Sequence, residues 1–135
     1  VDNQNGWTAG WDGKIFHTIN GGQSWELQDP GVDNAIWSLW FTSINDGWAL
    51  CLPDQILNTN DGGDSWSIIN VGSSIYMMDI CFSDPDNGWI ACNNGNVYHT
   101  TDGGTNWELE NISDDSFYKV LFNRKALFLQ NGTNK

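Results

Sequence analysis

The sequence predicts an all-β protein built from consecutive units of four short antiparallel strands. Tryptophan recurs at a fixed spacing of 41 residues, as in Trp25, Trp66 and Trp107. Short apolar segments alternate with polar segments rich in glycine, asparagine and aspartate, which is typical of strands joined by turns. A period of about 40 residues with four strands is characteristic of one blade of a β-propeller.

The predicted strands keep the same order in each period. A continuous apolar strand comes first, a strand starting at Gly-Trp second, a strand ending in threonine third, and a strand starting at the recurring tryptophan fourth. The first strand is expected at 35–41, 75–82 and 117–122, and the second at 6–10, 47–51 and 88–92. The third strand is expected at 14–18, 55–59 and 96–100, and the fourth at 25–27, 66–69 and 107–109.

These strands define a single propeller segment over residues 1–135. Two complete blades are expected at 35–69 and 75–110. A partial blade at 6–27 lacks its first strand, and a second partial blade at 117–130 ends in a degenerate strand. The chain therefore contains strands for about three blades, which form a partial propeller or part of a ring completed by oligomerisation.

The turn before each recurring tryptophan carries threonine, Asp or Asn, glycine and tryptophan at fixed spacing. The Asp or Asn side chain accepts nearby backbone N–H groups and closes an Asx-turn. The glycines allow the positive φ that a tight hairpin requires. We assign structural roles to Thr18, Asn20, Gly22, Trp25, Thr59, Asp61, Gly63, Trp66, Thr100, Asp102, Gly104 and Trp107.

This turn resembles the Asp-box, or bacterial neuraminidase repeat. The longer unit, from Gly-Trp through His-Thr-Thr-Asp-Gly-Gly to the tryptophan, is similar to the propeller repeats of photosystem II stability/assembly factors. The resemblance covers residues 6–110, and the first copy departs from it by carrying Asn20 in place of Asp. It implies a propeller whose boxes lie away from the ligand face, and an extracytoplasmic or secreted location.

About three blades do not close a propeller, which needs about four to eight. Two interpretations remain. The chain, which starts at Val1 rather than Met, is a piece of a longer propeller, or copies of it complete a ring by pairing strand 117–122 with strands 6–27. The C-terminal end of the chain is basic, which favours docking of this end onto an acidic copy or onto the chain's own first blade. As the alternative, the basic end is a solvated tail that protects a sheet edge. Its cations are Lys119, Arg124, Lys125 and Lys135.

Composition excludes several classes of partner. With 17 acidic and 5 basic residues, the net charge is −12, whereas nucleic-acid binding needs a basic face. No apolar run is long enough to cross a bilayer, so we expect no membrane insertion. An odd number of cysteines prevents a complete disulfide framework. We interpret Cys51, Cys81 and Cys92 as buried free thiols, with a Cys81–Cys92 bridge as the alternative.

We expect no catalytic residues, no metal and no cofactor. Sialidases bind their substrate with three arginines, whereas this chain has only Arg124. His17 and His99 occupy equivalent repeat positions, so we assign them structural roles. Asp79 interrupts an apolar strand, which makes it a candidate channel or acid/base group. Segment 84–88 is expected to be an ordinary turn, with a calcium loop as the alternative.

The sequence favours a non-catalytic binding or assembly scaffold that presents a protein- or glycan-binding face. Its repeats resemble those of the photosystem II assembly factors. The alternatives are a fragment of a propeller glycoside hydrolase and a structural repeat stretch within an adhesin. Trp11 falls in a turn where the other copies have Pro53 and Asn94, and a single tryptophan in a turn suits sugar stacking or a protein contact. The candidate ligand contacts are Trp11, Trp37, Trp40 and Asp79.

Overall fold

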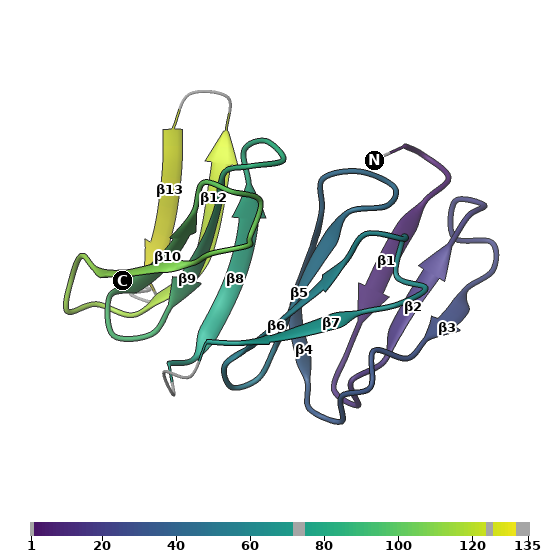
Figure 1. The fold of residues 1–135 in the computed structure, drawn as a ribbon, viewed down its shortest axis with the longest axis horizontal. Helices are drawn as coiled ribbons and strands as arrows, with labels where there is room; N and C mark the ends of the chain where they lie inside the picture. Colours follow the sequence, from purple (N-terminus) through teal and green to yellow (C-terminus); the bar gives the residue numbers. More distant parts are fainter. Residues whose placement is uncertain (1, 72–74, 124–125, 132–135) are drawn as a thin grey trace. The chain divides into compact units, whose positions relative to one another are not determined.

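The computed structural model describes residues 2–71, 75–123 and 126–131. They form thirteen strands and no helix, which confirms the predicted all-β fold class (Figure 1). The chain divides into two compact units, Val1–Gly72 and Ser73–Lys135. Three cations of the predicted basic end lie outside the described residues: Arg124, Lys125 and Lys135.

The first unit contains a three-stranded sheet of order β1-β2-β3 and a four-stranded sheet of order β4-β5-β6-β7. All neighbouring strands are antiparallel. This is the strand arrangement of one partial and one complete propeller blade. The strands are β1 (Gly6–Ala9), β2 (Ile15–Thr18), β3 (Glu26–Gln28), β4 (Ile36–Phe41), β5 (Gly47–Cys51), β6 (Gln55–Thr59) and β7 (Ser67–Asn70).

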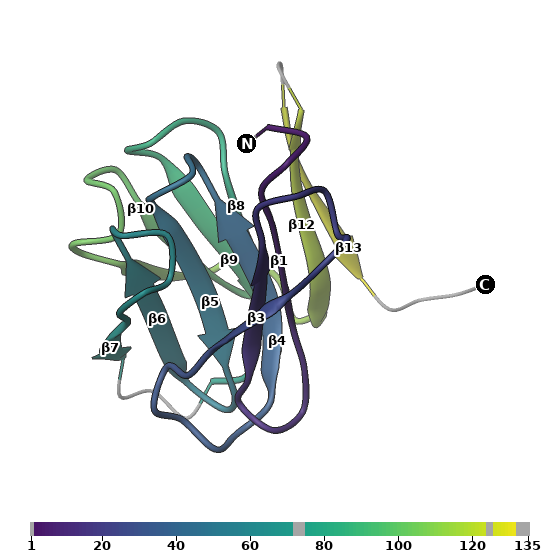
Figure 2. The same ribbon diagram turned by 90° about the vertical axis from the view of Figure 1, so that its right-hand side faces the viewer.

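The second unit contains a four-stranded antiparallel sheet of order β11-β10-β9-β8 and the hairpin β12-β13, whose strands lie side by side in Figure 2. With the first unit, this makes about three blades of a partial propeller, as predicted. The strands are β8 (Met77–Phe82), β9 (Gly88–Cys92), β10 (Asn96–Thr100), β11 (Glu108–Asn111), β12 (Phe117–Asn123) and β13 (Ala126–Asn131).

The Gly-Trp pair that starts the second strand of a blade is explained by close packing. Phe41 is the cross-strand neighbour of Gly47, and a Cβ added at Gly47 would lie 2.4 Å from the Phe41 ring. Phe82 covers Gly88 in the same way, at 2.6 Å. Since any side chain at these positions would displace the ring, glycine is required there for space rather than for an unusual φ.

The threonine-Asx turns have the same hydrogen bonds in all three copies. Each threonine hydroxyl donates to the Asp or Asn Oδ1 at 2.8–2.9 Å and accepts the second glycine's N–H at 2.9 Å. The same Oδ1 accepts the N–H four residues on at 2.9 Å. The residues involved are Thr18, Asn20, Gly22, Ser24, Thr59, Asp61, Gly63, Ser65, Thr100, Asp102, Gly104 and Asn106.

These bonds stabilise the ionised carboxylates. The hydroxyl of Ser65, followed by its backbone N–H, lowers the pKa of Asp61 to about 2. The Asn106 side chain lowers the pKa of Asp102. In the first copy, Asn20 makes the equivalent contacts without a charge and donates to the Ser24 hydroxyl at 2.8 Å. The carboxylates of these turns are therefore occupied by local donors.

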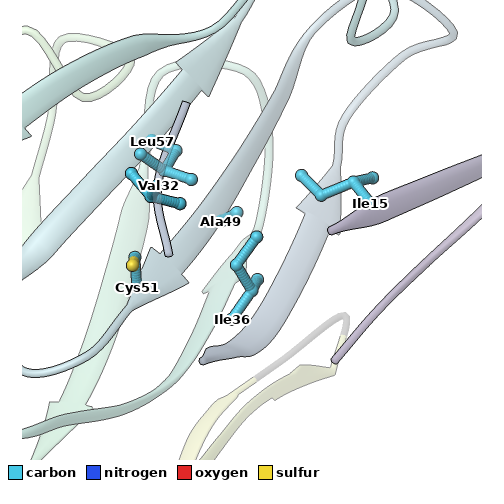
Figure 3. Close-up of a cluster of buried hydrophobic side chains, with 6 residues drawn as sticks. All are labelled: Ile15, Val32, Ile36, Ala49, Cys51 and Leu57. Carbon is cyan, nitrogen blue, oxygen red and sulfur yellow. The ribbon is translucent and has the colours of Figure 1, made fainter. Parts of the chain in front are cut away.

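The core of the first unit forms where its two sheets pack face to face (Figure 3). We call the face of a sheet that points toward the next repeat its forward face, and the opposite face its rear face. Ala9 and Ile15 lie on the forward face of β1–β3 and pack against Ala49 and Leu57 on the rear face of β4–β7. The full cluster of buried side chains is Ile15, Val32, Ile36, Ala49, Cys51 and Leu57.

The second unit repeats this packing of a rear face onto a forward face. The Phe122 ring of β12 stacks on Trp89 of β9, with ring centroids 5.6 Å apart and planes 1° apart. Val120, fully buried on the same face of β12, donates its backbone N–H to the Asp79 carboxylate on β8 at 3.0 Å. Burial of each such side chain stabilises a fold by about 1.5–3 kcal/mol.

All three cysteines are free and buried. Cys81 lies opposite Trp89 and Cys92 lies opposite Met77, so β8 and β9 do not align the two sulfurs for the Cys81–Cys92 bridge considered as an alternative. Burial raises the pKa of Cys92 to about 12, and burial followed by the Asp79 charge raises that of Cys81 to about 12. The thiols are therefore protonated and act as small apolar side chains.

Leu57→Ala should destabilise the first unit strongly, because Leu57 is 0% exposed and its truncation leaves a cavity between the sheets. We expect a loss of about 2–5 kcal/mol in the free energy of unfolding, measured by urea denaturation. Ile68→Ala in the adjacent strand, where the side chain is 43% exposed, is the control and should cost less than half as much. Equal losses would contradict the packing described here.

Asp61→Asn should make stability less sensitive to acid. The folded pKa of about 2 lies below the ordinary aspartate pKa of 3.8, so the carboxylate contributes stability above pH 3.8 that is lost as pH falls toward 2. The variant should be slightly less stable than the wild type at neutral pH and equal to it near pH 2, by urea midpoints at several pH values. Asp64→Asn, which removes a charge from the same turn, is the control. A deficit of Asp61→Asn that persists unchanged in acid would refute this account.

Candidate functional site

The structure brings together two of the predicted contact residues, Trp11 and Trp37. Trp11 lies in the turn between β1 and β2 and is 76% exposed, and Trp37 lies at the irregularity in β4 and is 46% exposed. Their ring centroids are 5.7 Å apart, with planes at 88° in an edge-to-face arrangement. Two exposed aromatic side chains in contact form an apolar patch, which is a candidate contact surface.

The backbone holds this aromatic pair in place. The Ile36 N–H, next to Trp37, donates to the Gly10 carbonyl, next to Trp11, at 2.9 Å. Gly13 ends the turn at φ +68°, where a Cβ would lie 1.8 Å from the Val32 carbonyl oxygen. Since only glycine fits that conformation and that contact, the turn is tied to both β4 and the loop before it. The pair is thus presented on a fixed support.

Two hollows extend from the aromatic pair along β1. One of about 270 Å³ lies between the Trp11 turn and the start of β4, and one of about 190 Å³ continues along β1 and β4. Among the described residues, the strand that pairs with β1 is β2. The lining residues are Trp7, Thr8, Ala9, Gly10, Trp11, Ala35, Ile36, Trp37, Ser38 and Leu39.

Charge around the site is negative. Residues 1–72 contain nine acidic side chains and one lysine, Lys14. The Lys14 ammonium is 2.9 Å from the Asp29 carboxylate, and hydrogen bonding to Lys14 lowers the pKa of Asp29. Asp12 follows Trp11 in the exposed turn. An aromatic pair and negative charge together suit a ligand that carries apolar and basic groups.

The other two candidate contacts lie elsewhere. Trp40, on β4, faces Trp48 of β5 and is partly buried. Asp79 belongs to the second unit, where its carboxylate accepts the Val120 N–H and links β8 to β12. Ala9, Gly10 and Ala35 line the hollow but were not predicted, because small residues without chemical function leave no signal in the sequence.

The two histidines and the turn at 84–88, considered as a calcium loop, make contacts within the fold. His17 stacks on Trp7 with centroids 4.4 Å apart, and His99 on Trp89 at 4.8 Å. The Asp84 carboxylate accepts hydrogen bonds from Asn87 and from the Asp86 N–H within its own turn. In the described ranges, no group of three His, Cys, Asp or Glu side chains could hold a metal ion. No helix in these ranges is long and apolar enough to span a membrane.

The fold of this chain is similar to that of several proteins of solved structure. The chain is similar to a structure of YCF48 bound to a D1 peptide, with 29% identity, a TM-score of 0.70, and coverage of 88% of this chain and 42% of that chain. YCF48 from Cyanidioschyzon merolae shares 19% identity over 96% of this chain and 47% of that chain, with a TM-score of 0.75. The chain thus spans less than half the length of either.

An ancestral GH74 enzyme is also similar, with 18% identity, a TM-score of 0.78, and coverage of 96% of this chain but 21% of that chain. At this identity the likeness shows the fold alone. No curated protein matches the chain. The family model described as Photosynthesis system II assembly factor YCF48 matches residues 1–76 and 66–132. Because these matches cover nearly the whole chain, the protein belongs to the YCF48 photosystem II assembly factor family, which is the family that the repeat motif resembles.

Proposed function

We propose that this chain is a non-catalytic protein-binding scaffold that holds an extended segment of a partner protein during assembly. The observation that carries the proposal is the exposed Trp11–Trp37 pair beside the hollows along β1 and β4. Support comes from membership of an assembly factor family and from a relative, 29% identical, that is bound to a D1 peptide.

The site offers two kinds of contact to such a segment. The hollows along β1 and β4 can receive apolar side chains of the segment, and burial of those side chains gives affinity. The Trp11 and Trp37 rings can contact alternate side chains of that segment, which gives specificity. Rigid aromatic side chains lose little conformational entropy on binding, so they are effective contact residues.

A protein partner is favoured over a glycan. Exposed tryptophans also suit sugar stacking, but the family match is to an assembly factor and the likeness to a GH74 enzyme concerns the fold alone. The Asp61 and Asp102 carboxylates are hydrogen-bonded within their own turns, and Asp79 accepts a backbone N–H. These acids therefore support the fold rather than glycoside hydrolysis, which needs two carboxylates placed around a sugar.

Trp37→Ala and Trp11→Ala should each weaken binding of a synthetic D1 peptide by about tenfold or more, since central aromatic contacts dominate such interfaces. Isothermal titration calorimetry measures the Kd. Tyr76→Ala is the matched control, because Tyr76 is 51% exposed and lies in the second unit, and it should leave Kd unchanged. A wild-type chain that binds no D1 peptide, or alanine variants that bind it as tightly as wild type, would contradict the proposal.

A further inference from the structure

The Trp11–Trp37 pair has flat ring surface that its own contact does not use. In an edge-to-face pair, the edge of one ring meets the face of the other, so the first ring keeps both of its faces. The two rings meet in this way at 5.7 Å, and Trp11 is 76% exposed. The face of an indole ring carries negative potential and attracts cations more strongly than the faces of other aromatic side chains. A cationic group can therefore stack on this pair.

Two aspartates lie beside the aromatic pair. Asp12 stands in the β1–β2 turn, directly after the first tryptophan of the pair and directly before Gly13. Asp33 stands between Val32 and Asn34 in the loop before β4. The carbonyl oxygens of Val32 and Asn34 would lie 1.8 Å and 3.3 Å from a Cβ added at Gly13. This backbone packing places the two aspartates, both exposed, next to each other in the first unit.

Neither of these carboxylates is neutralised within the described part of the chain. Asp12 and Asp33 form no hydrogen bond through their carboxylates and no ion pair there. By contrast, the Asp29 carboxylate accepts the Lys14 ammonium at 2.9 Å and the Gly31 N–H at 3.0 Å. Lys14 is the one lysine of residues 1–72, which contain no arginine. Two negative charges beside the aromatic pair are thus available to a cation on a partner.

A guanidinium suits this arrangement better than an ammonium does. It is planar, so it stacks on an indole face, and its N–H donors form a rigid fork that matches carboxylates. A lysine ammonium is a compact and strongly hydrated charge, so it gains less from the ring. The hollow of about 270 Å³ at the aromatic pair can receive an apolar side chain that neighbours the arginine. Besides the two tryptophans, it is lined by Ala9, Gly10, Ala35 and Ile36.

We propose that Asp12 and Asp33 make the Trp11–Trp37 site selective for an arginine next to an apolar residue in the partner segment. The guanidinium stacks on an indole ring and donates hydrogen bonds to the two carboxylates. This inference rests on the proposed function, because it names the residue that the site recognises in the bound segment. Charge complementarity of this kind contributes to specificity more than to affinity, so it decides which segment is bound.

Three synthetic peptides that differ at a single position test the selectivity. Each has capped ends and a central residue between two leucines, and this residue is arginine, lysine or citrulline, the uncharged analogue of arginine. Isothermal titration calorimetry at low salt should give the arginine peptide a Kd about tenfold below that of the citrulline peptide, with the lysine peptide between them. The difference should shrink at high salt, because exposed charges are screened.

Charge-removing variants assign the selectivity to residues. Asp12→Asn and Asp33→Asn should each reduce the ratio of the citrulline Kd to the arginine Kd by about two- to fivefold. Both should leave the citrulline Kd unchanged, which also shows that the variants are folded. Asp64→Asn is the matched control, because it removes one charge from the same unit and should leave the ratio unchanged. Asp64 closely follows Gly62, which bonds to Trp7 at the start of β1, whereas the site follows the end of that strand.

The outcomes separate this proposal from the proposed function. Equal Kd values for the arginine and citrulline peptides would overturn the arginine selectivity, and so would a preference for arginine that persists when both aspartates are replaced. A chain that binds the D1 peptide but not the arginine peptide would overturn the selectivity and leave the peptide-binding function standing. A chain that binds neither peptide would contradict both proposals.

Discussion

The structure depends on the packing of one phenylalanine ring per repeat against glycine and tryptophan. Phe41 covers Gly47 within its own sheet, stacks on Trp7 of the preceding sheet at 3.7 Å, and meets the edge of Trp66 at 6.1 Å. The ring therefore joins β4, β5 and the three-stranded sheet at one point. A shift of one residue in β4 would turn the ring to the other face, so this contact fixes the strand register.

The same packing links neighbouring repeats through their turns. The Trp7 indole N–H donates to the Gly62 carbonyl at 2.9 Å, and the Gln28 amide donates to the same oxygen at 3.0 Å. Gly62 lies in the threonine-Asx turn of the following repeat, which Asp61 holds closed. The turn motif thus does more than reverse the chain, because it presents a carbonyl to the preceding sheet.

The repeat made most of the fold predictable from the sequence, because strands and turns recur at equivalent positions. The turn roles of Thr59 and Asp61 follow from local spacing, and local hydrogen bonds fulfil them. The meeting of Trp11 and Trp37 could not be predicted, because it depends on the irregularity of β4 at Trp37 and on the packing of Gly13 against Val32. Asp79 was singled out as an unusual strand carboxylate, but its partner is a backbone N–H that the sequence does not mark.

Trp11 differs from the shared positions because it takes no part in the packing that the repeats have in common. Positions shared by all copies, such as Trp7 and Trp89, are engaged in stacking within the fold, and changing them would disturb the packing of sheets. Trp11 stands in a turn where the other copies carry Pro53 and Asn94, so nothing in the common packing requires it. The proposed contact at Trp11 is therefore separable from the packing of the blades, since function resides in sites placed on a fold.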